Sequence, residues 1–161
     1  MVEVLAVGLS DIKVARQGQN LRSSGLGSCV GLVLFDSLRH IAGMAHIMLP
    51  DNKITRGKAH PPGKFANTAV PELLKQLLAI GAKKSNLYAK MAGGAEMFRT
   101  TTGFTANIGM RNIEAVKAEL DAHHFELVSA DVGGNFGRSI EFVTETGDLR
   151  IHTVSQGDKV I

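Results

Sequence analysis

The residue best suited to covalent chemistry is Cys29, the only cysteine in the chain, which lies in the glycine-rich stretch Gly25-Leu-Gly-Ser-Cys-Val-Gly31. Because glycine tolerates backbone angles that other residues resist, such a loop can bring peptide N–H groups close to a substrate. A lone cysteine cannot form an internal disulfide, which leaves the thiol free and agrees with a reducing compartment. A thiol attacks a carbonyl carbon efficiently only as the thiolate, so the chemistry requires a base or a cationic group beside it.

His46 is the candidate for that base. The apolar run from Val30 to Phe35 predicts a buried strand directly after the cysteine, and residues 41–50 predict a neighbouring strand after a short turn. In a hairpin of this length, Cys29 and His46 fall near the same end. The pattern alone also allows a simpler interpretation, because a lone cysteine is often a small core residue and a strand histidine is often a satisfied core residue.

The sequence around both residues resembles the CheD family of chemoreceptor glutamine deamidases. The resemblance begins with Gly25-Leu-Gly-Ser-Cys-Val30 and with His46 in Met44-Ala-His-Ile-Met-Leu-Pro50, seventeen positions after the cysteine. It continues in family order through Gly63-Lys-Phe-Ala66, Ala92-Gly-Gly-Ala-Glu-Met-Phe98, Asn107-Ile-Gly-Met-Arg-Asn112 and Asp131-Val-Gly-Gly-Asn135 with Arg138. Several motifs in one order are far more specific than one glycine-rich loop, so the chain is identified as a member of this family.

The resemblance implies a protein-glutamine deamidase that converts glutamines of methyl-accepting chemoreceptors to glutamate in bacterial or archaeal chemotaxis, with Cys29 and His46 as catalytic residues. It also implies a third catalytic residue, a hydroxyl residue six positions before the cysteine, which is usually threonine in the family. Ser23 occupies this position, and Ser24 is the substitute if the register is displaced by one. A serine keeps the hydroxyl group but lacks the methyl group that stiffens threonine.

The predicted reaction proceeds through a thioester on Cys29. The thiolate attacks the amide carbon of the glutamine, and N–H groups of the turn formed by Gly27, Ser28 and Cys29 bind the substrate and hold the oxyanion. His46 protonates the departing ammonia and then activates water, and the reaction requires no cofactor. The family-matched positions expected to line the site are Gly93, Gly94, Asn112, Gly133, Gly134 and Asn135. The glycine pairs among them also fit a simpler interpretation, because such pairs form ordinary tight turns.

Two other classes of function stay open at this point. One is a different thiol hydrolase or transferase that uses the same cysteine and histidine. The other is a non-catalytic binding module, because the resemblance implies that CheD proteins also bind and stimulate a CheC-type response-regulator phosphatase. The expected partners are therefore chemoreceptor cytoplasmic helices and, in the second case, such a phosphatase.

Length and composition indicate one domain spanning residues 1–161, with 44% apolar and 20% charged residues. No apolar run approaches the roughly 18 residues of a membrane span, and the start of the chain lacks a basic leader. A cytoplasmic protein that is not inserted in a membrane is therefore expected. The sequence contains no HExxH, CxxC, P-loop or strand-to-helix GxGxxG pattern, so no metal or nucleotide is indicated. Seven phenylalanines, one tyrosine and no tryptophan argue against nucleic acid.

The chain has a net charge of +3. Its lysines and arginines cluster only around the proline- and glycine-containing loop 50–63, which contains Lys53, Arg56 and Lys58 and is followed by Lys64. Loops of this length inside a compact domain are often functional or mobile. Because it begins four residues after His46, the loop is either a substrate-contacting cover or a plain solvated segment.

Helical spacing of apolar residues predicts helices at 65–80 and 109–123, with Pro71 as the misfit in the first. Strands are predicted at 2–9, 11–15, 86–91, 125–132, 138–145 and 149–154 besides the hairpin, whereas 16–24 is interpreted as a polar loop and 155–161 shows no strong pattern. The expected fold class is therefore α+β, a single domain of mixed β-sheets layered with two main helices. The resemblance implies similarity to the catalytic domain of the cytotoxic necrotising factor deamidase toxins.

Overall fold

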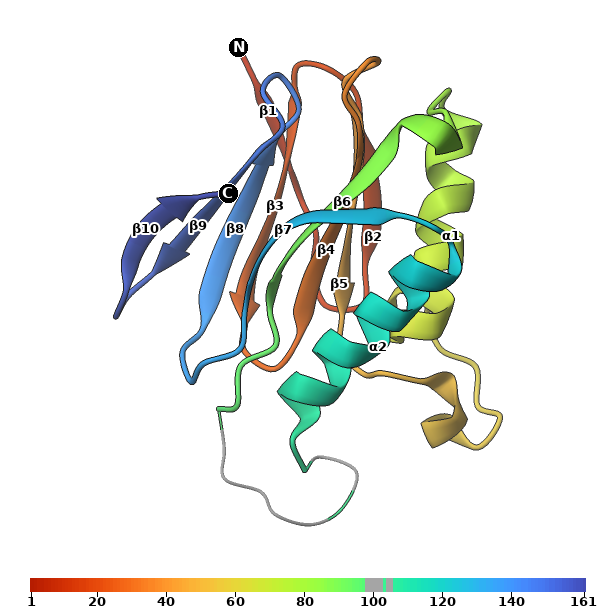
Figure 1. Cartoon of the computed structure of the whole chain (residues 1–161), viewed down its shortest axis with the longest axis vertical. Coiled ribbons are helices and arrows are strands. Elements are labelled where there is room, and N and C mark those ends of the chain that lie inside the picture. The colour runs from red at the N-terminus through yellow and green to blue at the C-terminus, as the bar shows by residue number, and fades with distance from the viewer. Residues whose placement is uncertain (98–102, 104–105) are drawn as a thin grey trace.

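Two five-stranded sheets and two α-helices form three layers in the computed structural model, which describes residues 1–97, 103 and 106–161 (Figure 1). Sheet A contains, in spatial order, β1 (Glu3–Ala6), β3 (Gln19–Leu26), β8 (Arg138–Val143), β9 (Asp148–Thr153) and β10 (Gly157–Val160). Sheet B contains β2 (Ile12–Ala15), β5 (Ile41–Ile47), β4 (Val30–Asp36), β6 (Leu87–Gly93) and β7 (Glu126–Val132). Both sheets are mixed, because β1 pairs with β3 and β6 pairs with β7 in parallel while the other neighbours are antiparallel. This arrangement confirms the predicted α+β class.

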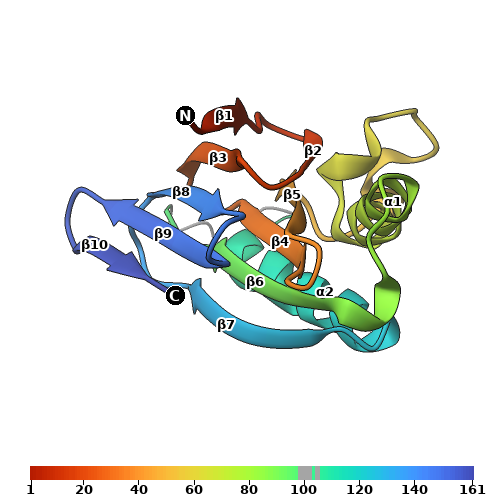
Figure 2. The same ribbon diagram turned by 90° about the horizontal axis from the view of Figure 1, so that it is seen from above.

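The helices α1 (Ala66–Ala79) and α2 (Ile108–Ala122) lie on the face of sheet B that is turned away from sheet A (Figure 2). Three short 3₁₀ helices complete the helical part of the described chain: η1 (Asn52–Thr55), η2 (Pro62–Lys64) and η3 (Lys84–Asn86). Pro71 is exposed, and α1 continues through it, so the loss of one backbone hydrogen bond does not break the helix. Both predicted helices are therefore confirmed to within one residue at each end.

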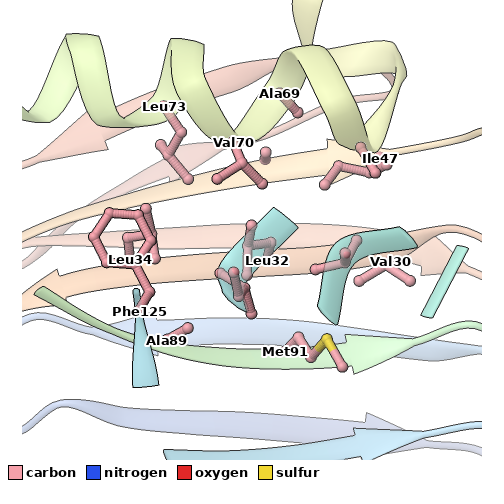
Figure 3. Close-up of a cluster of buried hydrophobic side chains, with 14 of the residues drawn as sticks. Val30, Leu32, Leu34, Ile47, Ala69, Val70, Leu73, Ala89, Met91 and Phe125 are labelled. Atoms are coloured by element: carbon pink, nitrogen blue, oxygen red, sulfur yellow. The ribbon is translucent and has the colours of Figure 1, made fainter. Parts of the chain in front are cut away.

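Alternate residues of β4 enter two different hydrophobic cores. Leu32 and Leu34 pack with Val70 and Leu73 of α1 between the sheet and the helices (Figure 3). The residues between them in sequence face the other way and pack against sheet A in the second core, which includes Val33, Phe35, Leu21 and Phe142. Because β4 is buried on both faces, it reads as a continuous apolar run rather than as an alternating strand.

The prediction of a polar loop at residues 16–24 is wrong, because β3 runs from Gln19 to Leu26 through the middle of sheet A. Its inward residues include Leu21, Ser23 and Leu26, and the pairing with β8 shifts register between the last two. This irregularity contains Gly25 at a φ of 70° and returns Leu26 to the inner face. Polar composition and the shifted alternation together conceal the strand from a periodicity argument.

The tail also contains a strand that its pattern did not reveal. β10 pairs antiparallel with β9 at the edge of sheet A, and all four of its residues are exposed. Its backbone pairing, rather than burial of apolar side chains, holds it in place, so it has no hydrophobic signature. No described helix is long and apolar enough to cross a bilayer.

Candidate active site

The carboxyl ends of β3, β5 and β6 and the starts of β4 and α2 converge at one end of the molecule, the lower end in Figure 1. Cys29 lies there, in the short connection between β3 and β4. Three consecutive carbonyl groups of this connection accept hydrogen bonds from outside it: Gly27 from Ala95 N at 2.9 Å, Ser28 from Asn112 Nδ2 at 2.9 Å and Cys29 from Gly94 N at 2.8 Å. Because all three carbonyl groups are held, the orientation of the cysteine loop, residues 27–29, is set by the segments around it.

The N–H groups of the cysteine loop differ in what they are free to bind. Gly27 donates its N–H to the carbonyl of Gly25 at 3.1 Å, so the prediction that it holds an oxyanion is not supported by this geometry. The N–H groups of Ser28 and Cys29 have no acceptor among the residues that the structure describes. Two adjacent free donors are the arrangement that an oxyanion requires. The side chain of Met97, which belongs to the family-matched motif at residues 92–98 but was not among the expected site residues, lies against Gly27.

Gly93 lets β6 approach the cysteine loop closely. It has a φ of 112°, and a Cβ atom at this position would lie 2.2 Å from the carbonyl oxygen of Cys29. Any side chain would therefore push the loop away from β6. The carbonyl group of Gly93 in turn accepts a hydrogen bond from Gly133 N at 2.9 Å, and Glu96 N donates to Gly134 at 2.9 Å. Gly93 and Gly94 thus act here as close-packed backbone, whereas a Cβ atom at Gly133 would meet open space, and Gly134 and Asn135 are exposed.

His46 extends from β5 toward sheet A, and its side chain is almost completely buried. Its Nδ1 lies 2.8 Å from the hydroxyl oxygen of Ser23 on β3, so this contact joins the two sheets. Ser23 donates its only hydroxyl proton to the carbonyl of Val7 at 2.7 Å. The same oxygen must therefore accept a hydrogen bond from His46 Nδ1–H, which assigns the tautomer from the hydrogen-bond network. Ser24 is exposed, so the structure places Ser23 and not Ser24 beside the ring.

This tautomer leaves Nε2 of His46 as a lone-pair nitrogen, and the atom is buried without a partner among the described residues. Burial lowers the pKa of His46 below its ordinary value, and the carbonyl of Val7 offsets only part of this effect. Burial raises the pKa of the Cys29 thiol. Both shifts favour the uncharged thiol and the uncharged imidazole at neutral pH.

Cys29 and His46 lie near the same end of the β4–β5 hairpin, as predicted, and the structure adds that they share one face. His46 pairs with Gly31, and Cys29 lies two residues before Gly31, hence on the same side of the strand. No hydrogen bond joins these two described residues, so they are diagonal neighbours rather than a closed pair. Such contacts are often long without substrate and tighten when it binds.

A buried arginine supports the end of β6 from the side of sheet A. Arg138 Nε lies 2.9 Å from Asp131 Oδ2, and Arg138 Nη1 lies 3.4 Å from the carbonyl oxygen of Gly93. Lys159 of β10 pairs with the other oxygen of Asp131 at 3.0 Å. Burial alone would raise the pKa of Asp131, but the hydrogen bonds and charges of Lys159 and Arg138 outweigh it and hold the pKa below its usual range. The network ties both sheets together behind the cysteine loop.

The basic loop after β5 contains η1 and η2, and Lys53, Arg56 and Lys58 are all exposed on it. None of these three cations forms an ion pair with an acid in the described part of the chain. Lys64 instead lies 3.3 Å from His60 Nδ1. The loop therefore presents unneutralised positive charge to solvent.

Fold and site together define an α+β protein with a free cysteine and a serine-held histidine on one face of a hairpin. The chain belongs to the CheD family: the family described as CheD chemotactic sensory transduction matches residues 48–153. The chain is 48% identical over 162 residues to the chemoreceptor glutamine deamidase CheD of Halalkalibacterium halodurans, with all of both chains covered. It is 43% identical over 159 residues to the protein of the same name from Bacillus subtilis, covering 98% of this chain and 96% of that one. These findings confirm the resemblance, and the relatives extend it over the Cys29 and His46 region that precedes the family match.

Proposed function

We propose that this protein is a cytoplasmic enzyme that converts glutamine side chains of methyl-accepting chemoreceptors to glutamate through a thioester on Cys29. The names of its relatives support the substrate and the reaction. One structural observation carries the mechanism: Ser23 holds His46 at Nδ1, while Nε2 has no partner among the described residues and lies on the face that His46 shares with Cys29.

In the attack step, Nε2 of His46 accepts the thiol proton while the sulfur forms its bond to the amide carbon. We infer that the proton moves during the attack, because the raised pKa of Cys29 and the lowered pKa of His46 both favour the neutral groups before it. The resulting imidazolium donates from Nδ1 to Ser23, whose hydroxyl group is itself fixed by Val7. Charge formed on the ring is thereby stabilised by an acceptor that is already in place.

The oxyanion of the tetrahedral intermediate accepts hydrogen bonds from the N–H groups of Ser28 and Cys29. His46 returns its proton to the departing nitrogen, the C–N bond breaks, and ammonia leaves a thioester on the sulfur. His46 then takes a proton from water, which attacks the thioester carbon. Collapse of this second intermediate releases the glutamate carboxyl group and returns the proton to Cys29, so the enzyme ends in its starting state.

Chemoreceptor cytoplasmic regions are expected to present the target glutamine on a helix, and the family resemblance implies this partner. The positive loop formed by Lys53, Arg56 and Lys58 suits the acidic character expected of receptor methylation segments. Exposed charges of this kind mainly accelerate encounter and are screened by salt.

The test is incubation of the full chain with a purified receptor cytoplasmic fragment, read by peptide mass spectrometry for conversion of glutamine to glutamate. Wild-type protein should convert specific glutamines, Cys29→Ala should convert none, and His46→Ala should be nearly inactive. Conversion by Cys29→Ala would refute the thiol mechanism. Unchanged glutamines with the wild type, together with stimulation of a CheC-type phosphatase, would replace the proposal with the binding-module alternative, which stays a prediction.

A further inference from the structure

The side chain of Asn112, in the second turn of α2, joins the two segments that carry the thiol and the imidazole. Asn112 has no exposed surface. Its Nδ2 lies 2.9 Å from the carbonyl oxygen of Ser28 and 3.0 Å from that of Met48. Ser28 directly precedes Cys29, and Met48 follows His46 by two residues. One amide group therefore contacts the backbone beside both reacting residues.

The two hydrogen bonds lie beyond the point where the hairpin stops pairing. The last paired residues of β4 and β5 at this end are Val30 and Ile47. His46 itself still pairs with Gly31, but beyond Val30 and Ile47 no ladder pair holds the cysteine loop against the segment that follows β5. The NH₂ group of Asn112 bridges the carbonyl groups of Ser28 and Met48, and thus takes the place of the next pair.

The helix that carries Asn112 is fixed by packing in the hydrophobic core. α2 is anchored in the helix-facing core by Ile113 and Val116, the first of which directly follows Asn112. The same Ile113 packs against Gly94, where an added Cβ would lie 2.4 Å from its Cγ1. Gly94 N in turn holds the carbonyl of Cys29. The helix therefore holds the cysteine loop at two points.

The orientation of the amide is determined by its partners, because both neighbouring atoms are carbonyl acceptors and only the NH₂ end can serve them. Its oxygen is buried without a partner among the described residues. An unpaired buried oxygen costs free energy, so an apolar residue here would avoid that cost but would lose both donors. Asparagine at this position therefore supplies both hydrogen bonds at the cost of one unpaired oxygen.

Resting on the proposed function, we infer that Asn112 is a positioning residue that sets the distance between the Cys29 thiol and the His46 imidazole. It touches neither reacting atom and acts through the backbone of the cysteine loop and of Met48, which follows β5. Before substrate binds, no direct hydrogen bond holds the thiol to the ring, so their approach depends on where these backbones lie.

The experiment compares Asn112→Ala and the nearly isosteric Asn112→Asp with Asn20→Ala, which removes another buried asparagine, one bonded to Glu141 on sheet A. With a receptor fragment as substrate, both Asn112 variants should lose kcat by about 10- to 100-fold at little changed KM, as expected for a displacement of about 1 Å. A second readout needs no substrate: the pH profile of Cys29 alkylation by iodoacetamide should move from the wild-type curve toward that of His46→Ala. Asn20→Ala should keep the wild-type kcat and the wild-type profile.

Asn112 variants that keep both kcat and the alkylation profile, whatever their thermal stability, would overturn the proposal. If the wild type deamidates nothing, the proposed function fails, and the alkylation profile alone still decides the role of Asn112. If neither variant folds, NMR of the wild type decides: the side-chain NH₂ protons of Asn112 should exchange slowly and shift when His46 titrates. Fast exchange, or no response to His46, would refute the bridge.

Discussion

Replacement of Ser23 by alanine tests the geometry of the site most directly. The hydroxyl oxygen accepts from His46 Nδ1–H at 2.8 Å and donates to the carbonyl of Val7 at 2.7 Å, and it is buried. Ser23→Ala removes both bonds and adds no group that can replace them. The imidazole then loses the acceptor that selects its Nδ1–H tautomer, and the carbonyl of Val7 loses a donor.

The magnitudes follow from these two contacts. Each buried polar group left without a partner costs about 1–3 kcal/mol, so the free energy of unfolding should fall measurably. For activity, a preference of about 1–2 kcal/mol for the reactive tautomer corresponds to a factor of about 5–30 in its population. We therefore expect Ser23→Ala to lose about 5- to 30-fold in kcat, with KM nearly unchanged because the serine side chain is buried.

The assay is glutamine-to-glutamate conversion in a receptor fragment, followed by mass spectrometry at saturating substrate. Ser24→Ala is the matched control, because Ser24 is exposed one residue further along the same strand. Ser23→Thr keeps the hydroxyl group and should keep or raise the activity. Full activity in Ser23→Ala, or a greater loss in Ser24→Ala, would refute the assignment of Ser23 as the residue that orients the ring.

Three further predictions concern the pH dependence of activity, the stability of the fold and the association of the protein with receptor fragments. Burial lowers the pKa of His46, so its neutral form persists below the ordinary value and the acid limb of kcat/KM should lie below about pH 6.5; a limb above this value would contradict a neutral imidazole base. The pKa of Asp131 is lower in the folded state than in the unfolded state. The ionised carboxylate of Asp131 therefore stabilises the fold above the unfolded-state pKa of about 3.9, and this stabilisation is lost as the pH falls through the folded-state pKa. Asp131→Asn should therefore lower the free energy of unfolding at neutral pH by about 1–3 kcal/mol and weaken its dependence on pH below about 4, as measured by denaturant titration; an unchanged pH dependence would count against the ion pair. Replacing Lys53, Arg56 and Lys58 together by alanine should raise KM for receptor fragments and reduce its salt dependence at nearly constant kcat, and a fall in kcat at constant KM would instead assign the loop to the shape of the site.

The sequence by itself determined the elements whose signals are local. The apolar runs of β4 and β5 with their short turn predicted the hairpin, and the hairpin placed Cys29 and His46 near the same end. The helical spacing of apolar residues likewise predicted α1 and α2. Such patterns depend on residues only a few positions apart, and they are retained whatever the rest of the chain does.

The tertiary structure alone decided how these residues are held. The hydroxyl group of Ser23 donates its proton to the backbone carbonyl of Val7, 16 residues away. A pattern of side chains in the sequence contains no information about where a backbone carbonyl group lies. β3 is polar and shifts its register within the strand, so it was read as a loop although it carries Ser23. The contact from Asn112 to Ser28 joins residues 84 positions apart, and it exists only because α2 packs on the face of sheet B with its start beside the cysteine loop. Long-range contacts of this kind follow from the packing of whole layers, which no local spacing in the sequence encodes.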